Sequence, residues 1–292
     1  MHRVGIVVCY FGKWPRGFDI FLKTCAGNPT VHFLFFTDAE PPGRLPGNLV
    51  FKPFRLDDLK ALSSKKLGMN VAVKTPYKVC DLRPAFGVIF EEYLQDFDFW
   101  GYCDLDVVFG NLRHFLTEEV FSTYDVIATR KEYVSGHFTL YRNAERIRRL
   151  YEESADYRRV FQEETHWAFD ECNFLWHYLL NGGSLLDTKA DVDSMTHVLK
   201  RLAARGTIQV CFENLVREGM DLRMTSPRWK VCWDRGQLID TVRREAFMYF
   251  HLNVLRFNDR FRIPTWQVVP DVFCITEDGF SVEWLPGLFA GR

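Results

Sequence analysis

Residues 98–110 read DFWGYCDLDVVFG, and this stretch decides the fold. A hydrophobic run typical of a buried strand ends in two carboxylates, Asp104 and Asp106, and a glycine follows soon after. Side chains two residues apart in a strand point to the same side, so both carboxylates can converge on one cation. Hard divalent ions prefer oxygen ligands, and Mg²⁺ is often shared between carboxylates and substrate phosphates. The stretch therefore indicates chemistry on a phosphorylated ligand.

Apolar neighbours argue against a plain solvated strand end as the setting of these carboxylates. Trp100, Tyr102 and Val107 surround the pair, and large hydrophobic residues of this kind are usually buried. Two buried like charges repel each other unless a cation or hydrogen-bond donors compensate them. We therefore favour a metal site, and a solvated pair that caps the next helix is the alternative.

The segments around this stretch predict an α/β fold. Residues 4–9 and 32–36 are continuous apolar runs, and residues 18–25 between them have helical spacing. Continuous rather than alternating apolar strands are typical of a parallel sheet covered on both faces. Further helices are expected at 56–67, 76–95, 144–153, 170–180 and 193–204. We expect one α/β domain, residues 1–292, with an irregular, β-containing C-terminal part.

Composition excludes several classes of function. The formal net charge is -1, so no overall positive field calls for nucleic acid. No run of about 18 apolar residues occurs, so we expect no membrane helix and a cytoplasmic protein. A peripheral contact at the inner membrane face stays open. The eight cysteines are scattered singly without a C-x-x-C pair, which argues against a zinc knuckle and predicts buried free thiols in a reducing compartment.

An Asp-x-Asp pair by itself fits two unrelated chemistries. Haloacid-dehalogenase-type phosphatases also place hydrophobic residues before such a pair, and there the first aspartate is a nucleophile. Their motif normally lies on the first strand, whereas two predicted strands precede it here, and no convincing later Gly-Asp-x-x-x-Asp follows. The other chemistry is transfer from a nucleotide sugar.

Six stretches carry a resemblance to a known family. They are YFGKWP (10–15), TPYKVCDLRPA (75–85), WGYCDLDVVFG (100–110), SGHFTLYRN (135–143), FDE (169–171) and FHL (250–252). Together they span most of the chain and resemble a family of bacterial glycosyltransferase-like proteins with the GT-A fold, long described only as a domain of unknown function.

This resemblance implies a GT-A-like, Rossmann-related fold: a mixed, mostly parallel sheet flanked by helices. Residues 1–110 would be the nucleotide-binding half and residues 111–292 the acceptor-binding half. The implied activity is metal-dependent transfer of a hexose from a nucleotide sugar, a UDP-sugar by preference, to a glycan or glycolipid acceptor in surface polysaccharide synthesis. A non-catalytic sugar-nucleotide or glycan-binding protein is the alternative outside enzymes.

The resemblance also implies a Mn²⁺ or Mg²⁺ ion on the donor diphosphate. Asp106 would be the direct ligand, and Asp104 would bind through water or contact the ribose. His251 is the candidate third ligand, against the alternative of a hydrogen-bonded core histidine. Arg256 or Arg260, just beyond it, would contact the diphosphate.

Several residues are candidates for contacts with the nucleotide. Tyr10, Phe11 and Asp38 lie at the ends of the first two predicted strands, where open α/β sheets bind ligands. An aromatic ring there would stack on the base and a carboxylate would bind ribose, with ordinary loop packing as the alternative. Lys78 and Asp81 are one helical turn apart and fit a surface ion pair, although the resemblance implies nucleotide contacts.

Two further stretches are candidates for contacts with the sugars. Gly136 would allow close approach of a sugar, and His137 would form a hydrogen bond with it. The alternative is a glycine required by a turn, followed by an exposed histidine. Asp170 and Glu171 open a predicted helix, where acidic residues are favourable in any case. Either is also a candidate general base that deprotonates the acceptor hydroxyl.

Overall fold

The computed structural model describes residues 1–43, 45–185, 187–218 and 229–282. The chain divides into two compact units that alternate along the sequence. Unit 1 comprises Met1–Lys13, Thr30–Asp104 and Glu118–Asn214, and unit 2 comprises Trp14–Pro29, Leu105–Thr117 and Leu215–Arg292. The expectation of a single domain, with halves that meet at residue 110, stays a prediction.

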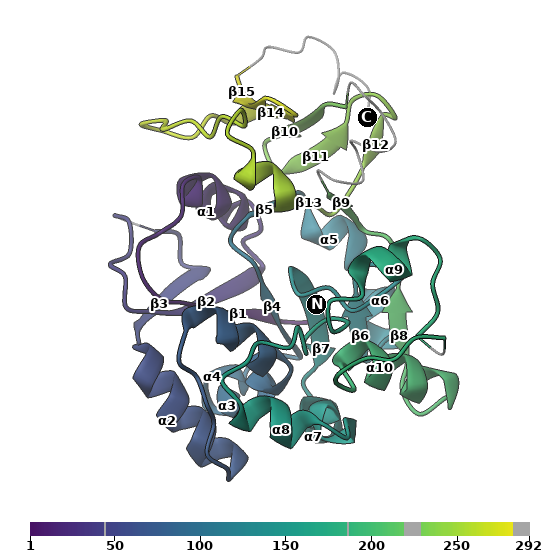
Figure 1. Cartoon of the computed structure of the whole chain (residues 1–292). Coiled ribbons are helices and arrows are strands. Elements are labelled where there is room, and N and C mark those ends of the chain that lie inside the picture. Colours follow the sequence, from purple (N-terminus) through teal and green to yellow (C-terminus); the bar gives the residue numbers. More distant parts are fainter. Residues whose placement is uncertain (44, 186, 219–228, 283–292) are drawn as a thin grey trace. The chain divides into compact units, whose positions relative to one another are not determined.

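In the described part of unit 1, the strands form one seven-stranded sheet in the order β3-β2-β1-β4-β7-β6-β8 (Figure 1). The strands are β1 (Val4–Tyr10), β2 (Val31–Thr37), β3 (Leu49–Pro53), β4 (Phe99–Cys103), β6 (Val126–Ala128), β7 (Phe138–Arg142) and β8 (Val210–Phe212). The strands β3, β2, β1 and β4 run parallel to one another, and β7 is antiparallel to both of its neighbours. The predicted mixed, mostly parallel sheet is confirmed.

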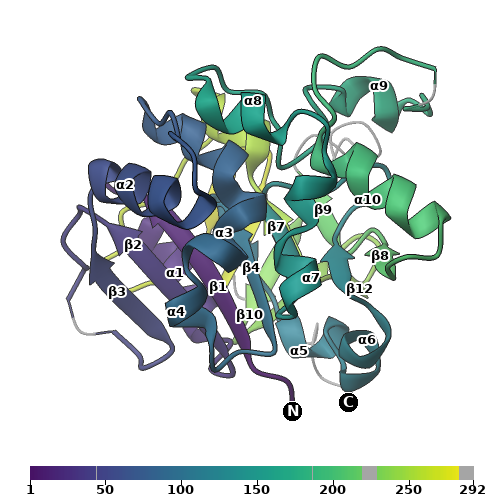
Figure 2. The same cartoon turned by 90° about the horizontal axis from the view of Figure 1, so that it is seen from below.

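Helices of unit 1 cover one face of this sheet. Figure 2 shows α2, α3, α4 and α7 against the strands. The helices are α2 (Leu56–Leu67), η1 (Pro76–Ala85), α3 (Phe86–Ile89), α4 (Glu91–Leu94), α6 (Glu118–Thr123), α7 (Glu145–Arg148), η2 (Leu150–Glu153), α8 (Tyr157–Gln162), α9 (Trp176–Leu180) and α10 (Met195–Ala204). Apart from those of α6 and α9, the apolar side chains of these helices join those of the sheet in one core, which holds the strand bearing Trp100 in place.

Two glycines allow β4 to sit deep in this core. A Cβ on Gly101 would lie 2.2 Å from the carbonyl oxygen of Thr139 on the paired strand β7. A Cβ on Gly87 would lie 2.5 Å from the indole of Trp100, whose ring stacks on Tyr141 with centroids 4.7 Å apart. Since real Cβ atoms do not approach so closely, glycine at both positions is required for this packing.

The single helix predicted over 76–95 is wrong in form. Residues 76–85 are a 3₁₀ helix, and two short α-helical turns, α3 and α4, follow. Pro84 lies inside this segment and has no N–H for an α-helical hydrogen bond. The apolar stripe by itself therefore wrongly indicated one continuous α-helix. The predicted helix over 193–204 matches α10 closely.

In the described part of unit 2, the strands form two sheets. A three-stranded sheet has the order β5-β13-β9, and an antiparallel five-stranded sheet has the order β12-β11-β10-β14-β15. The elements are α1 (Phe18–Ala26), β5 (Val107–Phe109), α5 (Leu112–Phe115), β9 (Val216–Glu218), β10 (Val231–Asp234), β11 (Gln237–Asp240), β12 (Glu245–Ala246), β13 (Tyr249–His251), η3 (Asn253–Phe257), β14 (Val272–Thr276) and β15 (Gly279–Ser281). The β-containing C-terminal part is thus confirmed.

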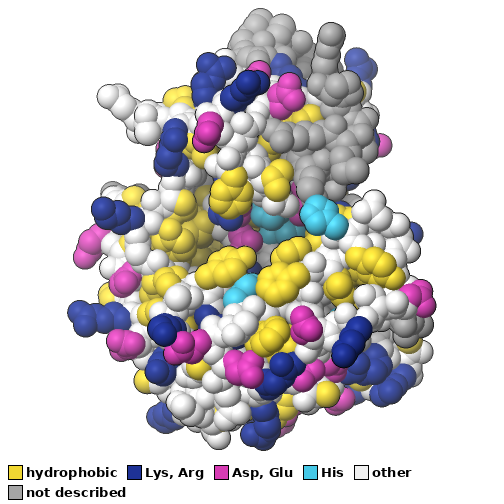
Figure 3. Space-filling model, in the orientation of Figure 1, with side chains coloured by type: hydrophobic (Ala, Val, Ile, Leu, Met, Phe, Trp, Pro, Cys, Tyr) yellow, Lys and Arg dark blue, Asp and Glu magenta, His cyan; other side chains and the backbone are white. Residues whose placement is uncertain are grey.

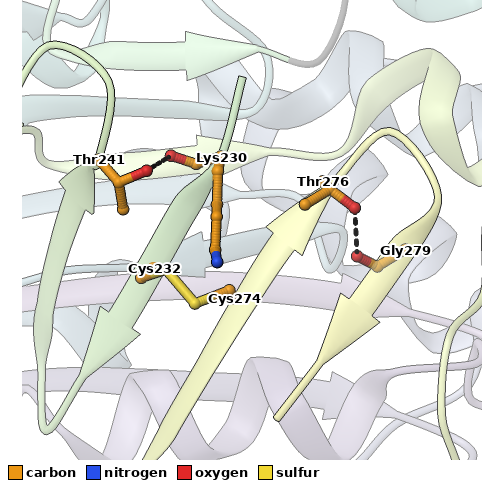
Figure 4. Close-up of a disulfide and its surroundings, with 6 residues drawn as sticks. All are labelled: Lys230, Cys232, Thr241, Cys274, Thr276 and Gly279. Atoms are coloured by element: carbon orange, nitrogen blue, oxygen red, sulfur yellow. Dashed lines mark hydrogen bonds between the residues drawn. A yellow bond between two sulfur atoms is a disulfide. The ribbon is translucent and has the colours of Figure 1, made fainter. Parts of the chain in front are cut away.

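A disulfide between Cys232 and Cys274 joins β10 to β14 (Figure 4). The two residues are direct partners in the strand register, with Cα atoms 4.0 Å apart. The prediction of free thiols throughout is therefore wrong for this pair, because pairing of strands 42 residues apart in sequence cannot be seen in single cysteines. The other six cysteines, all of them among the described residues, are not disulfide-bonded: Cys9, Cys25, Cys80, Cys103, Cys172 and Cys211.

The surface agrees with the near-neutral composition. Figure 3 shows basic and acidic side chains interspersed on the face drawn, as the net charge of -1 predicts. None of the described helices combines the length and apolar character that a membrane crossing requires.

Candidate active site

In unit 1, the candidate site begins where β4 ends. Asp104 directly follows β4, and its backbone N–H donates to the carbonyl of His137, 3.2 Å away. His137 in turn directly precedes β7, the antiparallel partner of β4. The sheet therefore places Asp104 beside Gly136 and His137, as their sequence positions suggested. His137 is buried rather than exposed, at 3% of its accessible surface.

Arg83 connects the acidic residues of this unit. Its Nη2 donates to the Asp104 carboxylate, and its Nη1 donates to the Gly136 carbonyl at 2.9 Å and to Asp170 Oδ2 at 3.1 Å. Burial acts to lower the pKa of Arg83, but Asp104, Cys80 and Asp170 outweigh it and raise the pKa well above the ordinary value. Arg83 is therefore a permanent positive charge between two carboxylates.

Arg83 was not among the site residues predicted from the sequence. It belongs to the stretch 75–85 that carries the family resemblance, which was the one available signal.

Asp170 and Glu171 meet at Gly136. The Gly136 N–H donates to Glu171 Oε1 at 2.9 Å, and the indole N–H of Trp176 donates to Glu171 Oε2 at 2.9 Å. A Cβ on Gly136 would lie 2.9 Å from a carboxylate oxygen of each acid. The absence of a side chain at Gly136 thus makes room for the two acids, and the predicted approach of a sugar stays a prediction.

The two acids hold protons more tightly than exposed carboxylic acids do. Burial, countered by Arg83 but reinforced by Glu171 and Asp81, raises the pKa of Asp170 to about 8. Burial and the Asp104 carboxylate likewise raise the pKa of Glu171 to about 7, against the hydrogen bonds from Gly136 and Trp176. Groups that titrate near neutrality are suited to proton transfer.

The expected helix start at Asp170 is wrong. Residues 169–174 form turns, and α9 begins only at Trp176. Ala168, Asn173 and Phe174 have left-handed backbones, with φ of 47°, 53° and 62°. Such conformations are costly for residues other than glycine and persist where the surroundings impose them. The favourable helix N-terminus therefore does not explain the two acids.

Lys78 and Asp81 form a buried pair, not the predicted surface pair. Both side chains are fully buried, and Lys78 Nζ donates to Asp81 Oδ2 at 2.9 Å. The ammonium also donates to the carbonyls of Val160 and Thr165, at 2.7 and 2.6 Å. An ammonium has three N–H donors, so all of them are used inside the protein.

Asp81 anchors the segment that leads to Asp170. Its carboxylate accepts from the N–H of Trp167 at 2.9 Å and of Phe169 at 2.8 Å, and His166 Nδ1 lies 3.3 Å away. Burial acts to raise the pKa of Asp81, but His166, Lys78 and the Phe169 N–H outweigh it and lower the pKa. The pair therefore positions the chain before Asp170 and Glu171, which the sequence did not suggest.

The three candidates near the ends of β1 and β2 differ in exposure. Phe11 packs into the core, as the packing alternative has it, and Tyr10 donates its hydroxyl to the Lys13 carbonyl at 2.7 Å. Asp38 is exposed and accepts from the Gly12 N–H at 2.7 Å. It lines a pocket of about 300 Å³ at the carboxyl ends of β2 and β3, together with Phe54 and Arg55.

In unit 2, a second group of charged side chains surrounds His251. Asp106 directly precedes β5, and β13 pairs His251 with Val107 on one side and with Glu218 on the other. His251 Nε2 lies 3.4 Å from Asp106 Oδ1, and Nδ1 lies 3.0 Å from Glu218 Oε1. Arg256 Nε lies 3.2 Å from Asp106 Oδ2. The structure thus brings together three predicted residues and adds Glu218, for which the sequence offered no signal.

Electrostatics in this group favour charged forms. Burial acts to raise the pKa of Asp106, but His251 and Arg256 outweigh it and lower the pKa to about 2. Burial acts to lower the pKa of His251, but Asp106 and Glu218 raise it well above the usual value. Two carboxylates therefore require a positive charge here, which a proton on His251 or a bound cation would supply.

The donor set fits a divalent cation. Asp106 offers a carboxylate oxygen and His251 an imidazole nitrogen, and the Glu218 carboxylate at the other ring nitrogen is the partner that metal-bound histidines usually have. Asp104, the remaining predicted ligand, belongs to unit 1 and stands two residues before Asp106 in the chain.

Comparison with protein families shows that residues 6–283 match the model of DUF6625, a family of unknown function, so the chain belongs to this family. A comparison with curated proteins found no match. Among solved structures, the chain is similar to the galactosyltransferase LgtC in complex with donor and acceptor sugar analogues. That similarity has a TM-score of 0.40 and 12% identity, over 85% of this chain and 87% of that one. An active-site mutant of LgtC gives a TM-score of 0.36 and 15% identity, over 76% and 78% of the two chains.

Proposed function

We propose that this member of the DUF6625 family is a metal-dependent glycosyltransferase. It would transfer a hexose from a nucleotide sugar, a UDP-sugar by preference, to a glycan or glycoconjugate acceptor in surface polysaccharide synthesis. The observation that carries the proposal is the surrounding of Asp106, where a buried histidine faces the carboxylate and is itself held by Glu218. A histidine held in this way is typical of metal centres.

Asp106 and His251 would hold Mn²⁺ or Mg²⁺, and the sequence-based assignment of Asp104 as a further ligand belongs to the same proposal. A bound ion would neutralise the charge that develops on the diphosphate leaving group. Arg256 lies beside Asp106 with a half-exposed side chain and would contact a diphosphate oxygen.

Asp170 and Glu171 would handle the proton of the acceptor hydroxyl. Their raised pKa values lie close to neutrality, where a group can accept a proton from a hydroxyl and release it again. Arg83 holds Asp170 in place, and the N–H groups of Gly136 and Trp176 fix Glu171. One of the two acids, in its ionised form, would be the general base.

Turnover of nucleotide sugars tests this proposal. The full chain is incubated with UDP-glucose, UDP-galactose and UDP-N-acetylglucosamine plus Mn²⁺, and the release of nucleoside diphosphate is measured. We expect release from at least one donor, and a loss of 100-fold or more in Asp106→Ala and His251→Ala, on the order of a lost charge-stabilising group. Asp57→Ala, which removes an exposed carboxylate on α2, is the matched control.

The other outcomes identify the alternatives. Phosphate released from sugar phosphates, with no affinity for UDP, would instead support the phosphatase. Binding of UDP or glycans without turnover of any donor would support a non-catalytic binding protein. If wild-type and Asp106→Ala proteins are indistinguishable, the transferase proposal fails.

A further inference from the structure

Unit 1 carries exposed aromatic side chains that packing does not explain. Tyr77 is 64% exposed and Phe174 is 46% exposed, although residues of this size are usually buried. His166 lies between them, with its ring centroid 4.4 Å from that of Tyr77 and 5.6 Å from that of Phe174. We call Tyr77, His166 and Phe174 the aromatic platform.

The platform continues directly into the acidic pair. Phe174 packs against Trp176 with centroids 5.4 Å apart, and the indole N–H of Trp176 donates to Glu171. His166 is tied to Asp81, which also holds the segment before Asp170. A ligand on these rings would therefore lie next to the carboxylates that we propose as proton acceptors.

The backbone holds Phe174 in this position at a cost. Asn173 and Phe174 both have left-handed backbones, which is rare for a bulky residue such as Phe174. The Asn173 side chain fixes the turn, since it donates to the Trp167 carbonyl at 3.0 Å and accepts from the Asp191 N–H at 2.8 Å. Strain of this kind is found where function requires it.

We propose that the aromatic platform is the acceptor subsite and binds a neutral pyranoside, with the apolar C–H face of the sugar on the rings of Tyr77 and Phe174. The proposal rests on the proposed function. Amphipathic rings offer apolar area at low entropic cost, and sugar hydroxyls at the edge would reach Asp170 and Glu171. A neutral sugar is favoured over an acidic one because the Arg83 guanidinium beside the acidic pair is already matched by Asp104 and Asp170, so it would not receive a further carboxylate. Partial burial together with Cys80, Glu171, Asp170 and Asp104 raises the pKa of Tyr77 to about 12.

Saturation-transfer NMR on the full chain tests the subsite without requiring turnover. The probes are methyl β-galactoside, cellobiose and the acidic methyl glucuronoside. We expect saturation of the ring C–H protons of a neutral probe, and roughly tenfold weaker binding in Tyr77→Leu and Phe174→Leu, which keep apolar bulk but remove the ring. Tyr93→Leu is the control, since Tyr93 is 42% exposed and packs against Phe36 instead. Thermal unfolding of each variant verifies that it is folded.

The outcomes separate the subsite from the proposed function. No saturation of any probe, saturation of the glucuronoside alone, or equal binding by all variants overturns the subsite. The subsite is also overturned if Tyr77→Leu and Phe174→Leu keep sugar binding but lose self-association of the chain in sedimentation experiments. A chain that binds neutral sugars on the platform but releases no nucleoside diphosphate from any donor overturns the transferase and leaves the sugar site standing.

Discussion

At the scale of single residues, buried charges organise unit 1. Arg83 lies between Asp104 and Asp170, and the Lys78–Asp81 pair fixes the segment that precedes Asp170. Removing any one of these charges would leave its partner buried without a counter-charge. Their effect on stability and on protonation can therefore be measured one residue at a time.

Asp81→Asn should destabilise the chain strongly. The substitution leaves the fully buried ammonium of Lys78 without its counter-charge, which typically costs about 3–5 kcal/mol. Urea unfolding followed by circular dichroism measures the change. Glu164→Gln is the matched control, because it breaks the exposed pair with Lys74 and should cost no more than about 0.5 kcal/mol. Similar small effects of both substitutions would contradict a structural role for the buried pair.

Stability should fall as the pH rises through neutrality. Burial raises the pKa of Asp170 from 3.8 to about 8 and that of Glu171 from 4.5 to about 7. Between the ordinary pKa of each acid and its raised pKa, the acid is protonated more fully in the folded chain than in the unfolded chain. Each rise in pH within that range therefore favours unfolding. The opposite effect of Asp106, whose pKa is lowered to about 2, is confined to pH values near and below its ordinary 3.8.

Thermal unfolding between about pH 5 and pH 8 measures this dependence. We expect the melting temperature of Asp170→Asn to fall less over that range than the melting temperature of the wild type. The difference between the two curves isolates Asp170 from the histidines, which titrate in the same range. Parallel curves would mean that Asp170 does not carry the extra proton.

At the scale of elements, the pairing of β4 with β7 builds the acidic site. The register places Gly101 opposite Leu140, and the ladder then brings Asp104 next to His137 and Gly136. A strand in the interior of the sheet is therefore the fixed support for the more strained segment 168–174. Gly101 and Gly136 serve different purposes in this region, and substitutions can distinguish them.

Gly101→Ala and Gly136→Ala should differ in what they damage. At Gly101 the new methyl group meets the Thr139 backbone at 2.2 Å, so we expect a loss of about 1–3 kcal/mol in the free energy of unfolding. At Gly136 it meets the carboxylates of Asp170 and Glu171 at 2.9 Å, and these side chains can shift more easily than backbone, although the shift disturbs their hydrogen bonds. Gly136→Ala should therefore lose less stability than Gly101→Ala but lose nucleotide-sugar turnover. Equal stability loss in both variants would contradict this division.

Reduction of the disulfide should weaken the five-stranded sheet of unit 2. The bridge closes a loop of 42 residues, which corresponds to roughly 4 kcal/mol of stabilisation in the chain-entropy model. Urea unfolding with and without dithiothreitol measures the difference, and thiol titration of the denatured chain should detect six free thiols before reduction. The Cys25→Ser variant keeps the bridge, so it should keep its sensitivity to dithiothreitol. Eight titratable thiols in the untreated chain would show that the bridge is absent in solution.

At the scale of the whole molecule, the chain passes repeatedly between its two units. One of these crossings lies inside the Asp-x-Asp motif, so Asp104 belongs to unit 1 and Asp106 to unit 2. Each unit then adds its own partners to one half of the motif. In the first, Arg83 pairs with Asp104 and also with Asp170. In the second, His251 and Arg256 pair with Asp106, and Glu218 pairs with His251.

Mn²⁺ and UDP together should raise the melting temperature of the full chain. A ligand that binds only the folded state stabilises it by about 2.7 kcal/mol at a hundredfold excess over its dissociation constant. Chelation by EDTA should remove the shift, and Asp106→Ala and His251→Ala should not show it. Asp57→Ala should respond as the wild type does. A shift that survives in the Asp106 and His251 variants would place the metal elsewhere.

Much of the fold could be predicted from local patterns. The continuous apolar runs of β1, β2 and β4 and the amphipathic α10 were visible because strand and helix periodicities are local properties. Elements shaped by distant contacts were not. The stripe over 76–95 suggested one helix, and the acids at 170 and 171 suggested a helix start, but Pro84 and the left-handed residues impose other conformations.

The amino-acid sequence by itself determined the α/β class, the position of the two carboxylates after a buried strand, and the family to which the chain belongs. Only the tertiary structure decided which groups surround them. Arg83 and Glu218 became part of the site, and Lys78 and Asp81 became an internal anchor rather than a surface pair. The physical reason is that a strand pattern depends on neighbours along the chain. The partner of a buried charge depends on which distant backbone and side-chain groups the fold brings within hydrogen-bonding distance.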